Sequence, residues 1–266
     1  TSVYMMILPG AQSENLQIAV KIDGNWNEMS KAQPDGGFLR GKKYVVELNT
    51  GDMNVNVFTD SRDSNTYSYK TIGSQIWMTE NLAYLPSVVG PGTGSTSEAY
   101  YYVYGYDGTD IAAAKATANY TTYGVLYNWP AAMSGAASSS ADPSGVQGIC
   151  PTGWHLPSDA EWTTLTTYLG GESVAGGKMK EAGESHWTSP NTGATNESGF
   201  TALPGGYRYF YDGTFFNIGS HGHWWSSAQY STGSAWGRRL SYNSSNVLWS
   251  FYTKEDGFSV RCIKDD

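Results

Sequence analysis

Hydrophobic and polar residues alternate along three short stretches near the start of the chain. Apolar side chains occupy every second position over residues 16–22, 44–48 and 53–57, which is the period of a half-buried strand. Between the last two runs, Thr50-Gly51-Asp52 predicts a tight hairpin. About four strands of this size form a marginal sheet when alone. We therefore expect residues 1–58 to pair by strand addition with an upstream portion of the same precursor or with a neighbouring subunit.

From about residue 59 the alternation fades, and the pattern predicts two helices. Residues 124–133 bring their leucine, tryptophan and methionine side chains to one helical face. The sequence Ser158-Asp159-Ala160-Glu161 is that of a capping box, in which the serine and the glutamate bond each other's backbone amides. It predicts the start of a second helix, which Gly170-Gly171 ends.

The rest of the chain predicts loops and short strands. Residues 87–97 and 134–144 are rich in small and turn-forming residues, so both are predicted loops. After residue 200, short aromatic runs are separated by glycine and end in the strand-like segment 258–262. A few helices followed by many short strands predicts an α+β fold with an antiparallel sheet.

The composition excludes several classes of protein. Charged residues make up 15% of the 266 residues, against about 25% in an ordinary soluble domain, while aromatic residues reach 14%. The net charge of −8 argues against a nucleic-acid partner and against docking on anionic lipid. No apolar run approaches the ~20 residues of a transmembrane segment. The opening Thr1-Ser2-Val3-Tyr4 does not resemble a signal peptide, so we expect a processed or truncated chain.

The two cysteines, Cys150 and Cys262, leave two interpretations open. They are either two buried thiols or one disulfide in an extracytoplasmic protein. The low lysine content and the many Tyr, Trp, Gly, Ser and Thr residues are typical of secreted or surface proteins and favour the disulfide.

No catalytic motif is present. Residues 171–178 approach a phosphate-binding loop, but the motif would need glycine at 172, where Glu172 stands, and serine or threonine at 179, where Met179 stands. The chain has neither a G-x-S-x-G elbow nor an H-E-x-x-H helix. His155 stands between apolar neighbours and is expected to be a structural residue. We predict no enzyme activity and no catalytic residue.

Two groups of side chains could be considered for a metal. His221 and His223 flank one glycine, but two ligands are too few for zinc and no third is identifiable. Asp60, Asp63 and Asn65 have loop spacing, but the glycine and the closing glutamate of a calcium hand are missing. We expect turn chemistry at these residues, and we predict no metal site and no cofactor.

Aromatic residues crowd the segment 204–252 together with arginine and asparagine. We expect Trp225 and Trp249 to fill the core, and other rings to form an exposed platform. Flat apolar rings with polar neighbours bind sugars or protein partners, because they bury large area at low entropic cost. The predicted ligand-binding residues are Tyr209, Tyr211, Trp224, Tyr230, Trp236, Arg238 and Tyr242.

Several motifs in order along the chain resemble one known family. They are IGSQIWMTENL at 72–82, YGVLYNW at 123–129, CPTGWHLPSDAEW at 150–162, SGFTALPGGYR at 198–208, WWSS at 224–227 and GFSVRC at 257–262. The chain over residues 59–266 resembles the Fibrobacter-type major paralogous domain (FISUMP). This is a surface-protein module of Bacteroidetes and relatives, allied to C-type lectin-like and formylglycine-generating-enzyme folds.

The resemblance implies a C-type lectin-like domain at 59–266, with a few helices, a twisted antiparallel sheet and long irregular loops. In this fold the two ends of the domain come together, and Cys150 and Cys262 are expected to form its long structural disulfide. The calcium-site motifs of sugar-binding lectins, Glu-Pro-Asn, Gln-Pro-Asp and Trp-Asn-Asp, are absent. Calcium-bridged sugar binding is therefore not expected. The oxidase chemistry of formylglycine-generating enzymes is not expected either, because the only cysteine pair is structural.

Residues 1–58 resemble the end of a fimbrillin-type pilin, through Tyr4-Met5-Met6-Ile7-Leu8-Pro9 and Gly41-Lys42-Lys43-Tyr44-Val45-Val46. In that family β-sandwich modules assemble by strand addition. The combination predicts an extracellular adhesin, or a fimbrial tip or accessory subunit, at the outer-membrane surface or in a fimbria. Its partners would be other pilin or surface subunits and a glycan or host-matrix protein. The alternatives are a structural surface module without a specific ligand and a glycan-acting enzyme.

Overall fold

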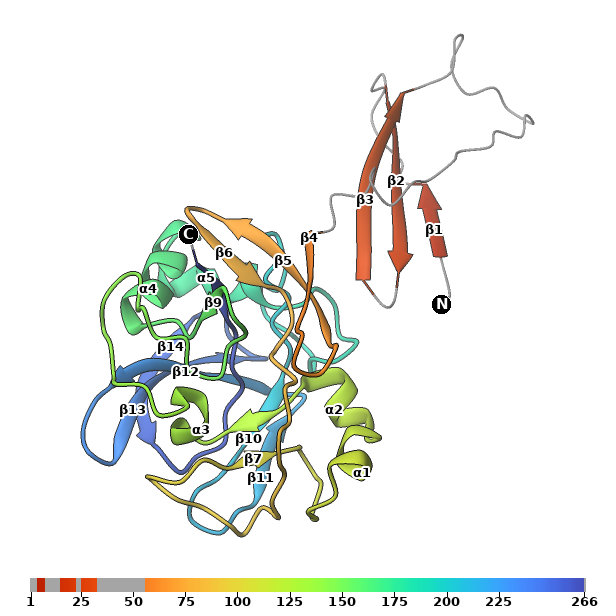
Figure 1. Cartoon of the computed structure of the whole chain (residues 1–266). Helices are drawn as coiled ribbons and strands as arrows, with labels where there is room; N and C mark the ends of the chain where they lie inside the picture. Colours follow the sequence, from red (N-terminus) through yellow and green to blue (C-terminus); the bar gives the residue numbers. More distant parts are fainter. Residues whose placement is uncertain (1–3, 8–14, 23–24, 33–55, 266) are drawn as a thin grey trace. The chain divides into compact units, whose positions relative to one another are not determined.

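The computed structural model describes residues 4–7, 15–22, 25–32 and 56–265. The chain divides into two compact units, Thr1–Asn56 and Val57–Asp266. Figure 1 shows both units, coloured along the sequence.

The described part of the first unit is an antiparallel sheet in the order β1-β2-β3. It consists of β1 (Tyr4–Ile7), β2 (Asn15–Ile22) and β3 (Asn25–Ala32). Strand β2 matches the alternating run predicted at 16–22. The predicted strand at 44–48 and the hairpin at 50–52 lie outside the described residues, and of the run at 53–57 only the end is described. Among the described strands, β1 and β3 form the two edges of this sheet.

The second unit contains a five-stranded sheet that joins the two ends of the domain. Its order is β4-β5-β6-β15-β9. The strands are β4 (Asn56–Thr59), β5 (Thr66–Ile72), β6 (Gln75–Met78), β9 (Trp154–His155) and β15 (Ile263–Lys264). Ile263 of the last strand pairs with Trp77 of β6 and with His155 of β9. The domain therefore closes by pairing its final strand with an early one, as expected for a lectin-like fold.

A second five-stranded sheet has the order β11-β10-β12-β13-β14. The strands are β10 (Gly205–Arg208), β11 (Phe215–Ile218), β12 (His221–Gln229), β13 (Ser234–Ser241) and β14 (Leu248–Thr253). Strands β10 and β12 pair in parallel, and the other neighbours are antiparallel. This sheet is curled (Figure 1), and together with a few short helices it confirms the α+β fold class.

Five helices are described around these sheets: α1 (Ile111–Lys115), α2 (Ala118–Tyr123), α3 (Trp129–Met133), α4 (Asp159–Tyr168) and α5 (Glu172–Met179). The predicted capping box is confirmed at α4, where Ser158 Oγ accepts from the Glu161 amide and the Glu161 carboxylate accepts from the Ser158 amide. The segment that approached a phosphate-binding motif forms α5 instead.

The helix predicted over 124–133 is only half correct. Leu126 and Tyr127 form β8, which pairs with β7 (Tyr101–Tyr102). The helix begins after Asn128, whose side-chain oxygen accepts from the Ala131 amide and caps α3. An asparagine that caps a helix starts it locally, so the residues before it were free to pair as a strand.

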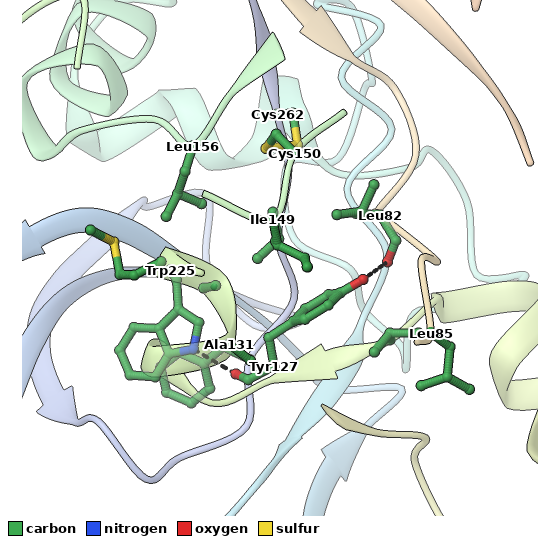
Figure 2. Close-up of a cluster of buried hydrophobic side chains, with 14 of the residues drawn as sticks. Leu82, Leu85, Tyr127, Ala131, Ile149, Cys150, Leu156, Trp225 and Cys262 are labelled. Atoms are coloured by element: carbon green, nitrogen blue, oxygen red, sulfur yellow. Dashed lines mark hydrogen bonds between the residues drawn. A yellow bond between two sulfur atoms is a disulfide. The ribbon is translucent and has the colours of Figure 1, made fainter. Parts of the chain in front are cut away.

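Two clusters of buried side chains form the core of the second unit. One contains Trp77, Trp162, Phe200 and Trp224, which lie between α4 and the sheets. The ring centroids of the pairs in contact are 4.7–6.4 Å apart. The other surrounds Tyr127 and Trp225, and Figure 2 shows it. Trp225, which was predicted to fill the core, is buried, and so are Trp77, Trp129, Trp154 and Trp162.

Cys150 and Cys262 form a disulfide, as predicted. Both cysteines are fully buried at the edge of the second core cluster (Figure 2). The bond joins the segment that leads into β9 to the residue before β15, so it fixes the closing strand covalently.

His155 is a structural residue, as expected, and it links β9 to helix α4 and to the residue after β15. Its Nε2 lies 2.6 Å from the Glu161 carboxylate and its Nδ1 lies 2.6 Å from the Asp265 carboxylate. Burial alone lowers the pKa of His155, but the hydrogen bonds and charges of Glu161 and Asp265 together raise it above its usual value. The folded protein therefore holds the proton on His155 more tightly than the unfolded chain does.

This difference makes the stability dependent on pH. Between the unfolded pKa of about 6.5 and the higher folded value, the folded state binds more protons, so the free energy of unfolding falls as pH rises. We expect the stabilisation by protonated His155 to be complete below about pH 6.5 and to be lost as the pH rises through the folded pKa. Urea titrations of the wild type and of His155→Gln across pH 5–9 test this, because glutamine does not titrate. Equal slopes against pH in the two proteins would contradict the prediction.

Candidate functional site

Strands β13 and β14 carry a group of exposed aromatic side chains. Trp236 of β13 lies opposite Phe251 of β14. In the next pair on this face, Trp249 lies opposite Arg238. Residues that pair across a ladder, and alternate residues along a strand, share one face of the sheet. Tyr230, which follows β12, packs against Trp236. We call Tyr230, Trp236, Trp249 and Phe251 the aromatic platform.

The rings of the aromatic platform support one another. Tyr230 and Phe251 are stacked, with ring centroids 4.1 Å apart and an angle of 8° between the planes. Trp236 packs against Trp249 with centroids 4.9 Å apart. Tyr230, Trp249 and Phe251 are nevertheless 52%, 48% and 49% exposed. The platform is therefore a preorganised apolar surface, which can bury large area with little loss of side-chain entropy.

Helix α4 sets the limit of the aromatic platform. Its first residue, Asp159, accepts from the guanidinium of Arg238, which also donates to the Asp159 carbonyl oxygen and to Thr163 Oγ1. These contacts anchor the start of α4 over the middle of the sheet. The helix covers the face as far as Arg238 and leaves the rings beyond it exposed.

Two of the predicted binding residues lie inside the fold. Trp224 is 1% exposed, packs against Trp162 and donates from its indole nitrogen to Asn81 Oδ1. Arg238 is 4% exposed and is held by Asp159. Neither side chain reaches a surface where a ligand could contact it, so the structure corrects both predictions. Arg238 positions α4 beside the aromatic platform.

Three further predicted residues lie apart from the aromatic platform. Tyr209 and Tyr211 follow β10, which is separated from β14 by two strands; Tyr211 is 81% exposed. Burial raises the pKa of Asp256 to about 7, and its carboxyl accepts from the Phe210 amide between the two tyrosines. Tyr242 is half-buried against the core cluster of α4. Of the predicted set, the structure brings only Tyr230 and Trp236 together.

Two members of the aromatic platform were not predicted. Trp249 was expected in the core but is 48% exposed, and Phe251 was not considered. The sequence does contain a signal, because Trp249 and Phe251 are two residues apart, as are side chains on one face of a strand. Which face is covered depends on α4, which lies about 80 residues earlier and which the local pattern cannot place.

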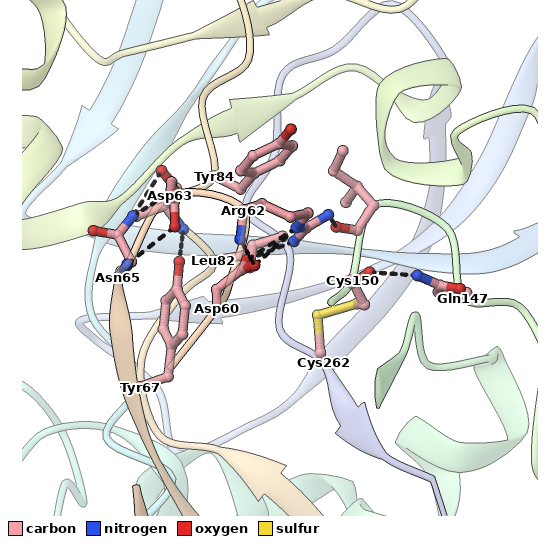
Figure 3. A network of polar contacts seen from close by, with 12 residues as sticks. Asp60, Arg62, Asp63, Asn65, Tyr67, Leu82, Tyr84, Gln147, Cys150 and Cys262 are labelled. Carbon is pink, nitrogen blue, oxygen red and sulfur yellow. Dashed lines mark hydrogen bonds and ion pairs between the residues drawn. A yellow bond between two sulfur atoms is a disulfide. The ribbon is translucent and has the colours of Figure 1, made fainter. Parts of the chain in front are cut away.

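The residues considered for calcium form a turn (Figure 3). Asp60 is buried and accepts from both Nε and Nη2 of Arg62, while Asp63 accepts from the amide and the side chain of Asn65. Arg62 also donates to the Ile149 carbonyl oxygen, which ties this turn to the segment beside the disulfide. Within the described residues, no three His, Cys, Asp or Glu side chains form a group that could hold a metal ion.

A comparison with protein families matches residues 71–264 to the Fibrobacter succinogenes major domain. The chain belongs to this family. The match begins in β5 and ends in β15, so the family domain contains the disulfide, the aromatic platform and, apart from Tyr67, the buried residues of both core clusters. Strands β1, β2 and β3 lie outside it. No curated protein and no solved structure matches the chain.

The family is that of a surface-associated domain, and the disulfide agrees with this setting. In the parts of the chain that the structure describes, no helix has the length and the hydropathy needed to cross a bilayer.

Proposed function

We propose that this protein is a non-enzymatic bacterial adhesin, or a fimbrial tip or accessory subunit, whose lectin-like domain binds a glycan or a protein ligand. The observation that carries the proposal is the aromatic platform, with three rings about half exposed beside a rigid helix start. Clusters of exposed apolar side chains mark interaction sites, and ring faces stack well on pyranose rings.

The proposal places the protein outside the cell, at the outer-membrane surface or in a fimbria. The buried disulfide supports this location, because such bonds persist in oxidising environments. The described edges β1 and β3 support assembly with a neighbouring subunit, because an open edge accepts an added strand. A chain that stays monomeric in light scattering at every concentration would contradict assembly through this sheet.

The test of ligand binding is an array of glycans and matrix proteins, probed with the whole chain with and without a chelator. We expect a limited set of ligands to be bound, and the same set with chelator, because the lectin calcium motifs are missing. If no arrayed glycan or matrix protein is bound, a structural module without a specific ligand would be the remaining function. Turnover of an arrayed glycan would instead favour an enzyme.

Trp249→Ala is expected to weaken binding of any ligand found on the array by roughly tenfold, because it removes a half-exposed ring of the aromatic platform. The free energy of unfolding should change by less than about 1 kcal/mol, since the side chain is already half exposed. Biolayer interferometry and urea denaturation measure the two effects.

Tyr168→Ala is the matched control for this variant. Tyr168 lies on α4, is 64% exposed and has no ring contact with the aromatic platform among the described residues. It removes a comparable exposed ring, so binding should stay within twofold of the wild type. Equal losses in the two variants would show that the platform is not the binding surface.

A further inference from the structure

The opposite face of the β10–β14 sheet carries a second group of side chains. Along β13, alternate residues point to opposite faces, so Arg239 stands on the reverse side from Trp236. Arg239 lies opposite His223 of β12 and Leu248 of β14. We call the group around it the Arg239 face. Its members are Tyr207, Phe216, His221, His223, Arg239 and Tyr252.

Arg239 has no partner in the part of the chain that the structure describes. The four other described arginines are all engaged: Arg62 by Asp60, Arg208 by the Pro91 and Glu255 carbonyl oxygens, Arg238 by Asp159, and Arg261 by Asn81. Arg239 makes no hydrogen bond or ion pair, and its Nε is shielded from solvent. An unpaired buried donor costs about 1–3 kcal/mol, so its persistence calls for an explanation.

His223 shows the same feature on the next strand. It is 4% exposed, and its Nδ1 is buried without a hydrogen-bond partner. Burial, followed by the nearby His221 and Arg239, lowers the pKa of His223 well below its usual value, so its ring is neutral at pH 7. Two polar groups on paired residues therefore lack partners at one place in the sheet.

Aromatic rings surround these two groups. The ring of Tyr207 lies 4.7 Å from that of His223 and 5.9 Å from that of Phe216. Tyr252 approaches His223 from β14, at 5.9 Å. Phe216 is 39% exposed, and Tyr207 and Tyr252 are partly exposed. The Arg239 face thus combines accessible ring surfaces with an unneutralised guanidinium.

Burial raises the pKa of both Tyr207 and Tyr252, and the nearby carboxyl of Asp256 raises it further. This carboxyl already accepts hydrogen bonds from the backbone amide of Phe210 and makes no ion pair with Arg239. The guanidinium is therefore left available for an anion from outside the chain.

We propose that the Arg239 face binds the carboxylate of an acidic sugar, such as a uronic acid at the end of a glycan. A planar guanidinium matches a carboxylate with two parallel hydrogen bonds, and the exposed rings of Phe216 and Tyr207 provide flat surfaces for the pyranose. Neutral histidines can bond the sugar hydroxyls as donor or acceptor. The net charge of −8 disfavours a large acidic polypeptide at the same place.

The sugar class rests on the proposed glycan-binding function, but the residues are separate from the aromatic platform. The proposal for the aromatic platform and the proposal for the Arg239 face can therefore fail independently. Loss of array binding in Trp249→Ala reports on the platform, whereas selectivity for a carboxylate reports on Arg239.

The test compares methyl β-D-glucuronide with methyl β-D-glucoside, which differ only in a carboxylate in place of a hydroxymethyl group. Each is titrated into the whole ¹⁵N-labelled chain, and NMR follows the Arg239 Nε–Hε signal and the histidine rings. We expect the glucuronide to shift these signals and to bind roughly tenfold more tightly than the glucoside, as expected for a charge-assisted hydrogen bond.

Arg239→Gln should remove this preference without unfolding the protein, because the native side chain makes no hydrogen bond to any residue that the structure describes. Lys70→Gln, which removes a positive charge from the exposed strand β5, and Trp249→Ala should both keep it. The proposal would be overturned if the two glycosides bound equally, or if Arg239→Gln kept the preference for the glucuronide. Tetraglutamate is titrated in the same way as an acidic peptide. Tighter binding of tetraglutamate than of the glucuronide, reported by the same NMR signals, would also overturn the proposal.

Discussion

Replacing both cysteines by serine is expected to lower the free energy of unfolding by about 4–5 kcal/mol. Cys150 and Cys262 are 112 residues apart, and joining them removes much of the conformational entropy of the unfolded chain. The bond also holds the residue before β15 against the segment before β9, so its loss loosens the strand that closes the domain. Urea denaturation of the double variant and of the oxidised wild type measures the difference.

A reductant supplies the control for this experiment. It should lower the unfolding midpoint of the wild type toward that of the Cys150→Ser, Cys262→Ser variant and leave the variant unchanged. Midpoints that coincide in oxidised wild type and variant would show that the disulfide adds nothing to stability.

Trp225→Ala is expected to cost about 3–5 kcal/mol of folding free energy. Trp225 is fully buried and stacks on Phe258 with centroids 4.3 Å apart. Its indole nitrogen donates to the Tyr127 carbonyl oxygen at 2.7 Å, as Figure 2 shows. The substitution therefore leaves both a cavity and a buried carbonyl without this donor.

Trp249→Ala is the matched control, because it deletes the same side chain from a half-exposed position on the same sheet. Thermal and urea unfolding of the two variants should differ by several kcal/mol in the free energy of unfolding, with Trp225→Ala the less stable. Similar losses would mean that burial does not separate the two tryptophans.

Features encoded over a few residues could be predicted from the sequence. The capping box at Ser158 and Glu161 located the start of α4, and the alternation at 16–22 located β2. Leu126 and Tyr127 were assigned to a helix because their spacing fits one, yet they pair with Tyr101 and Tyr102, about 25 residues earlier. Spacing along one segment does not reveal such a partner.

The candidate site was predicted only in part, for a similar reason. Trp224 and Trp249 occur in the same aromatic stretch and share one face of the β10–β14 sheet, but α4 covers the first and not the second. Arg238 and Arg239 are adjacent in sequence, and only the position of Asp159 decides which of them is neutralised. Burial is set by distant elements, so the residue type alone could not separate core from surface.

The position of the disulfide also determines how the domain responds to a pulling force. In the adhesin function proposed above, a domain bound to a surface carries tension along its backbone. Tension applied to the residues after Cys262 passes through the covalent link to Cys150. The 111 residues between the cysteines, which would extend by roughly 370–400 Å if pulled straight, are thereby kept out of the load path. The aromatic platform and the parts of both core clusters within this interval are therefore not pulled directly, and the load passes to the residues before Cys150.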